Sequence, residues 1–223
     1  MICDFLMPQH LPFEIWHEIA TRKIAISEPA IQLKGGTKRW HTVVEKDTSM
    51  NRLLRADITL TEYCEIIRRL HSIHHVLEAQ LSAYRPMQRE LPTTKRSALL
   101  LSDIVYFGLT PIQPEQLEAY PLMPPITSRE AALGAMYVLD GSALGGMLIH
   151  KQLLNNLFRQ GDGGGLAFFG ADPAAGMSQW IKFQTTLKKS LVFQDQVEEA
   201  VNAANRTFDY FYQCLRFSQK AKI

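Results

Sequence analysis

The sequence YVLDGSALGG, which runs from Tyr137 to Gly146, decides the fold of this chain. It lies within a pattern of apolar residues that predicts one long helix from about residue 128 to residue 158. Each of its glycines weakens a helix interior by about 1 kcal/mol relative to alanine. Because Gly141 and Gly145 are four residues apart, they lie on the same helix face. That face carries no side chains, so the helix can kink there and a large flat group can lie directly against its backbone.

A second segment, TKRWHTVVE from Thr37 to Glu45, lies about a hundred residues upstream and places one histidine on a predicted helix. The imidazole of His41 could supply an axial nitrogen to an iron atom. The carboxylate of Glu45, one helical turn later, could accept a hydrogen bond from the other ring nitrogen and so select the tautomer that binds metal. The spacing alone favours an ordinary amphipathic helix with a half-buried histidine. Together with the glycine segment, it favours a haem held between a ligand helix and a bare helix.

The two segments together resemble the haem oxygenases, specifically the small bacterial branch that includes partners of bacterial phytochromes. The matching patterns are Thr-x-x-x-His-x-x-x-Glu and Tyr-Val-Leu-Asp-Gly-Ser-x-Leu-Gly-Gly, and the resemblance extends from about Leu33 to Leu215. It implies an all-α, haem-oxygenase-like multi-helix bundle, with haem sandwiched between a proximal helix and a kinked distal helix. The chain then divides into an N-terminal extension of unknown role, residues 1–32, and a helical domain, residues 33–223.

Helical periodicity and local signals predict the other elements of this bundle. Apolar residues recur every three or four positions over residues 60–81 and 197–215, and the prolines between residues 110 and 126 predict a connector. Thr59 with Glu62, and Thr127 with Glu130, predict capping boxes at the starts of two helices. Gly35-Gly36 directly precedes the histidine segment, which predicts that the proximal helix begins late, near residue 37. No segment shows the clean alternation of a strand.

The resemblance also implies roles for the distal residues. Gly141, Gly145 and Gly146 would form a wall along which the backbone approaches bound dioxygen, although tight helix packing would use glycines equally well. Animal-type members carry a carboxylate directly after the first distal glycine, whereas this chain has Ser142. Ser142 could orient water in the distal pocket or bond to a carbonyl of its own helix. The catalytic candidates are therefore Gly141, Ser142 and Gly145.

Haem carries two propionates, which require cations and hydroxyls. Lys34 stands two helical turns before His41, and Tyr137 stands four residues before Gly141. Both match propionate-binding positions of the bacterial branch. Tyr137 also fits a half-buried core tyrosine. The resemblance thus predicts a haem site of His41, Lys34, Glu45, Tyr137 and Gly146, with His41 as the axial ligand of the haem iron.

The activity that the resemblance implies is oxidative cleavage of haem to biliverdin, carbon monoxide and ferrous iron. Haem would be both substrate and cofactor, dioxygen the oxidant, and a redox protein or small reductant the external electron donor. A phytochrome could use the product. A non-catalytic haem carrier or sensor on the same fold remains an alternative. A non-haem iron oxidase is a third hypothesis, using a helix face with His71, His75 and Glu78, but no paired Glu-x-x-His motif supports it.

The composition excludes several other classes of protein. A chain of 223 residues with 46% hydrophobic content can bury one sizeable core. A net charge of +2 argues against a dedicated nucleic-acid binder, and the apolar runs are shorter than the ~20 residues that span a bilayer. The N-terminus has no basic segment, so it does not predict a secretory signal. Three widely spaced cysteines without a Cys-x-x-Cys pair favour a reducing cytoplasm.

Overall fold

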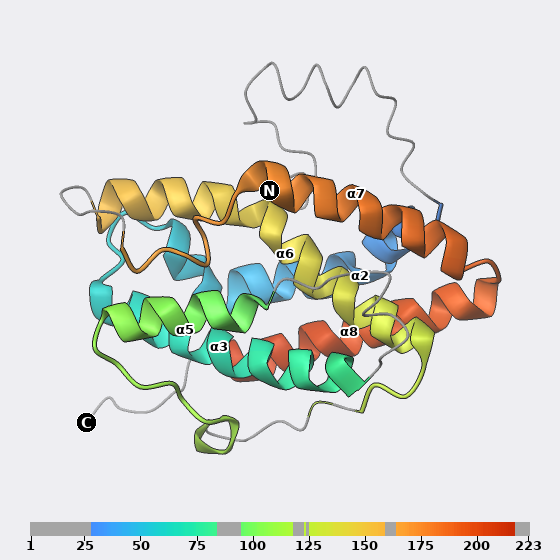
Figure 1. The fold of residues 1–223 in the computed structure, drawn as a ribbon, viewed down its shortest axis with the longest axis horizontal. Coiled ribbons are helices and arrows are strands. Elements are labelled where there is room, and N and C mark those ends of the chain that lie inside the picture. The colour runs from blue at the N-terminus through green and yellow to red at the C-terminus, as the bar shows by residue number, and fades with distance from the viewer. Residues whose placement is uncertain (1–27, 84–94, 118–122, 124, 159–163, 217–223) are drawn as a thin grey trace.

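The computed structural model describes residues 28–83, 95–117, 123, 125–158 and 164–216, and these residues form an all-α bundle. Six α-helices and two short 3-10 helices account for the regular structure of the described residues (Figure 1). Their bounds in chain order are α2 Glu28–Asp47, η2 Ser49–Leu54, α3 Leu60–Ala83, α5 Arg96–Tyr106, η3 Pro114–Gln116, α6 Arg129–Asn156, α7 Pro173–Ser190 and α8 Gln194–Leu215. The prediction of an all-α fold is confirmed.

Helix α8 is the centre of the bundle, because it packs against α2 and α6 extensively and also against α3. Its apolar face contributes buried residues at helical spacing, including Val197, Ala204 and Leu215. Helix α5 covers α3, and α7 covers α6. In Figure 1, α6 changes direction in its middle, which agrees with the kink expected of the distal helix. This bend turns the glycine segment across the bundle.

Helix α2 begins at Glu28, so the predicted late start near residue 37 is wrong. The helix continues through Gly35-Gly36 because packing against α8 offsets the low helix propensity of glycine. A Cβ atom on Gly36 would lie 2.5 Å from Cγ1 of Val201, and the carbonyl of Gly36 accepts a hydrogen bond from Asn205 at 3.2 Å. Gly36 therefore allows close approach of the two helices. Helix α2 also includes residues 28–32 of the predicted extension, and residues 1–27 lie outside the described part.

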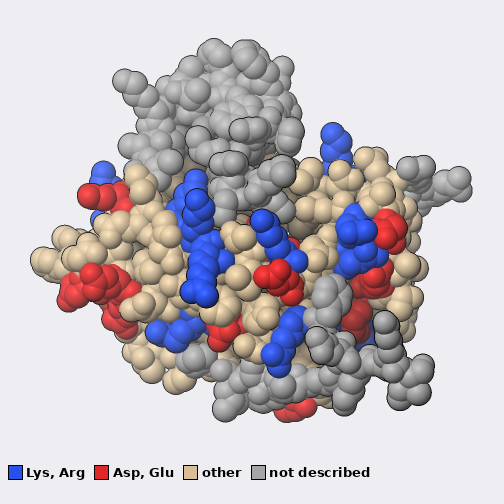
Figure 2. All heavy atoms as spheres, turned by 180° about the vertical axis from the view of Figure 1, so that it is seen from behind, with Lys and Arg blue, Asp and Glu red and all other residues tan. Residues whose placement is uncertain are grey.

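The surface carries charges of both signs. On the face drawn in Figure 2, the Lys and Arg side chains lie among Asp and Glu side chains rather than forming a broad field of one sign. A nucleic-acid interface would require a basic stripe or patch. This face therefore agrees with the small net charge of the sequence.

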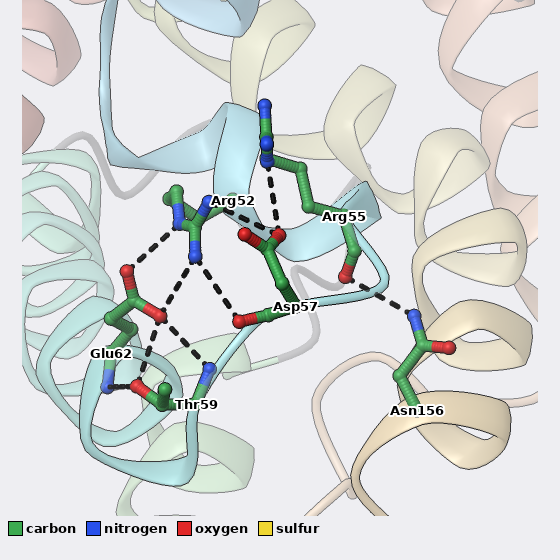
Figure 3. Close-up of polar contacts among 6 residues, drawn as sticks. All are labelled: Arg52, Arg55, Asp57, Thr59, Glu62 and Asn156. Carbon is green, nitrogen blue, oxygen red and sulfur yellow. Dashed lines mark hydrogen bonds and ion pairs between the residues drawn. The ribbon is translucent and has the colours of Figure 1, made fainter.

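The junction between η2 and α3 is held by a network of charged side chains (Figure 3). Arg52 donates two hydrogen bonds to the carboxylate of Glu62, at 2.8 and 3.1 Å, and a third to Asp57 at 3.3 Å. The Arg52 guanidinium, together with hydrogen bonds from Thr59, lowers the pKa of Glu62 to about 2. Asn156, at the end of α6, donates to the carbonyl of Arg55 at 3.2 Å. The network thus ties η2 to two helices of the bundle.

One predicted capping box is confirmed and the other is wrong. Thr59 and Glu62 exchange hydrogen bonds at the start of α3, with Thr59 Oγ1 accepting from the Glu62 amide and Glu62 accepting from the Thr59 amide. At the start of α6, Ser128 rather than Thr127 is the cap, because its hydroxyl accepts from the Ala131 amide at 3.0 Å. The chain offers two adjacent hydroxyls there, and the backbone of Ser128 has the extended conformation that a cap requires.

The apolar composition of helix α6 has a structural explanation. Among the described residues it is the one helix long and apolar enough, by length and composition, to cross a bilayer, although the sequence suggested that no apolar stretch would qualify. Buried positions make up 56% of its apolar window. A core helix passes the same test, and the packing of α6 against α7 and α8 accounts for its apolar composition.

Candidate functional site

A cavity of about 420 Å³ opens between α2, η2, α6 and α8. This volume lies within the roughly 300–1,000 Å³ that small-molecule and cofactor sites occupy. The lining is largely apolar, with a few polar side chains. It consists of His41, Val44, Glu45, Lys46, Met50, Asn51, Leu54, Arg55, Tyr137, Val138, Gly141, Ser142, Gly145, Leu148, Ile149, Phe208 and Phe211.

Helix α2 brings His41 to this cavity with part of its imidazole exposed. Nδ1 of His41 lies 3.3 Å from Oε1 of Glu45, one turn later on the same helix. This contact does not have the geometry of a hydrogen bond, and Nδ1 has no hydrogen-bond partner among the described residues. The ring of Phe208 stands edge-on to the imidazole, with centroids 5.5 Å apart. Phe208 and Glu45 are therefore close neighbours of the His41 ring.

Helix α6 supplies a second wall in which two of the predicted glycines line the cavity. A Cβ atom on Gly145 would meet no heavy atom within 4 Å, and one on Gly141 would meet only the ring of Trp180, at 3.8 Å. Neither glycine is required by a close protein contact, in contrast to Gly36. The absence of side chains here keeps cavity space open beside the helix backbone.

The other predicted distal and propionate residues lie in different surroundings. The hydroxyl of Ser142 donates to the carbonyl of Leu139 at 2.6 Å, the local alternative that the sequence left open. Tyr137 is buried at 5% exposure and its ring lies 5.6 Å from that of Trp180, yet it still lines the cavity. Gly146 is not among the lining residues and faces the backbone of Phe169, whose carbonyl oxygen is 3.6 Å from its Cβ position.

The cations at the cavity differ from the one that the sequence suggested. Lys34 is exposed on α2 and does not line the cavity. Lys46, on the last turn of α2, and Arg55, directly after η2, are the lysine and arginine of the lining. No motif marked them. Lys46 follows Glu45 on α2, and Arg55 reaches the cavity because η2 folds back beside α2. Phe208 and Phe211 were expected only as apolar positions of the last helix.

These residues fit a haem. A flat macrocycle needs an apolar slot, an axial nitrogen, a wall without side chains and cations near its carboxylates. The cavity offers His41 with Nδ1 turned towards Glu45, the two glycines without close neighbours, and Lys46 with Arg55.

The rival metal site finds no support in the part of the chain that the structure describes, where no group of three or more His, Cys, Asp or Glu side chains could hold a metal ion. His71 and His75 stack with ring centroids 5.9 Å apart. His74 is fully buried, which lowers the pKa of its imidazole well below the usual value. Of these three histidines, His74 is buried, His71 is of intermediate exposure and His75 is exposed.

Known proteins resemble this chain along most of its length. A family model described as "Heme oxygenase" matches residues 27–217. A haem oxygenase of Xanthomonas campestris pv. campestris (strain 8004) is 29% identical over 177 residues, which cover 74% of this chain and 96% of that protein.

A solved structure shares the fold. The haem oxygenase of Neisseria meningitidis, solved in NO- and CO-bound forms, superposes with a TM-score of 0.66 at 17% identity. The match covers 85% of this chain and 90% of that one. The match to the family model, which spans most of the chain, shows that this protein belongs to the haem oxygenase family and that its activity is that of a haem-degrading oxygenase.

Proposed function

We propose that this enzyme cleaves haem to biliverdin, carbon monoxide and ferrous iron in the cavity between α2 and α6. The observation that carries the proposal is the meeting of His41 with Gly141 and Gly145 in one apolar cavity, from helices about a hundred residues apart in sequence. Bound haem would supply the redox chemistry and would itself be the substrate that is opened. The protein's part is to bind it, orient it and restrict access of water.

His41 is the proposed axial ligand. Only a neutral imidazole can bind iron, and the nitrogen that faces Glu45 is Nδ1. Nε2 is then the nitrogen left for iron. A small rotation of either side chain would complete the Nδ1–H···Oε1 hydrogen bond, which would strengthen the ligand and hold its orientation. The edge-on contact with Phe208 would help to hold the imidazole ring of His41 in this orientation.

Gly141 and Gly145 are the proposed distal wall. Without Cβ atoms, the helix backbone could lie close to a bound haem, and the wall would then restrict the space left for a diatomic molecule. Ser142 uses its proton in the bond to Leu139, but its oxygen can still accept a hydrogen bond from water. The cavity lining holds no carboxylate from α6, so protons would reach the reacting oxygen through water.

We assign the two haem propionates to two sides of the cavity. Tyr137 lines the cavity from α6, whereas Lys46 and Arg55 line it beside η2. We retain Lys34 as an outer candidate only, since its flexible side chain would have to fold back along α2. Gly146 would support the distal segment by close packing against Phe169 rather than contact haem.

The wider setting is also proposed. An external donor, either a redox protein or a small reductant, would deliver electrons, and a phytochrome could use the biliverdin. We place the enzyme in the cytoplasm, since its cysteines carry no disulfide pattern and Cys64 and Cys214 are free thiols.

The test is an absorption spectrum of the purified protein with one equivalent of hemin, followed after a reductant is added in air. We expect a sharp Soret band that decays into a biliverdin-like spectrum. A Soret band that persists under reductant would indicate a carrier or sensor, and no Soret band would refute the haem site. His41→Ala should lose the histidine-ligated spectrum, while His75→Ala, on the exposed face of α3, should keep it.

A further inference from the structure

A second group of ionisable side chains lies behind the distal helix, on the side away from the cavity. His74 and Glu78 from α3, Arg96 from α5 and Asp140 from α6 line one narrow gap, together with apolar side chains. None of the four lines the large cavity. The mechanism proposed above uses none of them, although Asp140 directly precedes Gly141 in the chain.

Arg96 is a buried cation with few ways to be neutralised. It is 8% exposed, and its guanidinium carbon lies 4.4 Å from the ring centroid of Phe168. Phe168 is held there because Asp103 accepts hydrogen bonds from the amides of Ala167 and Phe168. The Nε atom of Arg96 has no hydrogen-bond partner among the described residues.

Asp140 lines the same gap as Arg96 and attracts it across that gap, without a direct hydrogen bond or ion pair among the described contacts. Glu78 is already engaged, since its carboxylate accepts hydrogen bonds from the amide and the hydroxyl of Ser97 at the start of α5. His74 is neutral because of its burial, and it fills space between the rings of Phe168 and Phe211. Asp140 is partly exposed, and the attraction of Arg96 opposes the burial that raises the pKa of its carboxyl group.

The position of Asp140 links this charge to the distal wall. Residues 137, 138, 141, 142 and 145 of α6 face the cavity, whereas residues 136, 139 and 140 face the gap. On the cavity side, Gly141 and Gly145 make almost no close contact that could fix the helix. A force on the back of α6 at Asp140 therefore acts where the helix is least restrained from the front.

We propose that Arg96 and Asp140 are a positioning pair, which holds the back of the distal helix towards α5 and so sets the clearance between the distal glycines and the haem. A buried cation facing a partly exposed carboxylate can favour one arrangement of the helices even where the pair adds little stability. The inference rests on the proposed placement of haem between His41 and the distal glycines.

The experiment compares Asp140→Asn, which removes the charge but keeps the shape, with Arg96→Lys, which keeps the charge but loses the planar guanidinium. The control is Glu130→Gln, which removes a carboxylate from the same helix about ten residues earlier, where it contacts Gln196. Each protein is loaded with hemin, reduced under CO, and the CO dissociation rate is measured. The ferric spectrum is also recorded against pH.

Both test variants should release CO about threefold faster or more, the effect of a weak coupling between neighbouring charged groups, while the control matches the wild type. The histidine-ligated spectrum should persist in all of them. Normal hemin binding with unchanged CO rates and pH profiles in both variants would overturn this inference alone, even if their melting temperatures fall. A wild type that binds no hemin would overturn it together with the proposed function. If Arg96→Lys does not fold, Asp140→Asn decides.

Discussion

Replacing Gly145 with alanine should make the protein without haem more stable and the haem enzyme worse. No heavy atom lies within 4 Å of a Cβ placed at Gly145, so alanine causes no clash. Alanine is favoured over glycine in a helix by about 1 kcal/mol, and substitutions at compatible sites usually yield about 0.4–1 kcal/mol. For a chain of this size, that free energy raises the melting temperature by roughly 1–4 °C.

The same methyl group would occupy the cavity that we assign to haem. It would stand between the backbone of α6 and the ligand side of the macrocycle, so it should lower either hemin affinity or the rate of ring opening. Overpacking of a well-filled site costs about 1–3 kcal/mol, which corresponds to a loss of roughly 5- to 150-fold. Stability and function should therefore change in opposite directions.

The assay is thermal unfolding of the protein without haem, combined with hemin titration and turnover. The matched control is Gly134→Ala on the same helix. A Cβ there would lie 2.1 Å from the carbonyl oxygen of Ala200, so this variant should lose stability. If Gly145→Ala melts at a lower temperature than the wild type, the glycine serves the helix itself. If it binds and cleaves hemin normally, the wall at Gly145 does not face haem, and the reasoning fails.

Two further predictions concern stability. Burial raises the folded-state pKa of Asp140 from 3.8 to about 6, so the folded protein gains stability from this group at low pH and loses it as pH rises through that range. As pH rises from 4 to 7, the free energy of unfolding of Asp140→Asn in urea should increase relative to that of the wild type, by at most about 3 kcal/mol. A difference between the two proteins that does not change with pH would contradict the raised pKa of Asp140. Thr59→Ala removes the cap of α3 and should cost about 1 kcal/mol in the same assay, whereas Thr127→Ala, at a hydroxyl that does not cap α6, should change little.

Local signals in the sequence were sufficient for most of the secondary structure. The periodicity of residues 60–81 and the Thr59–Glu62 box predicted α3, because both depend on contacts within a few residues. The same approach failed at Gly35-Gly36, where a local preference against helix was outweighed by the contact with Val201. It also chose Thr127 over Ser128, since either hydroxyl fits the local pattern.

For the candidate site, the sequence identified residues whose chemistry is distinctive in itself. A histidine with a glutamate one turn later, together with glycines four apart in an apolar helix, indicates a ligand and a bare wall when both patterns occur in one chain. Lys46, Arg55, Phe208 and Phe211 have no such signal. Lys46 reaches the cavity at the end of α2, Arg55 reaches it through the fold of η2, and the two phenylalanines reach it through the packing of α8.

The sequence by itself determined that the chain is helical, which helices carry His41 and the distal glycines, and that haem oxygenases are its relatives. The tertiary structure decided that α2 continues through two glycines, which cations line the cavity, and that Arg96 lies in the same gap as Asp140. The physical reason is the separation in sequence between the residues that interact. Helix propensity and capping act between residues up to four apart, whereas these outcomes depend on packing between side chains more than about forty residues apart, whose free energies exceed the local preferences.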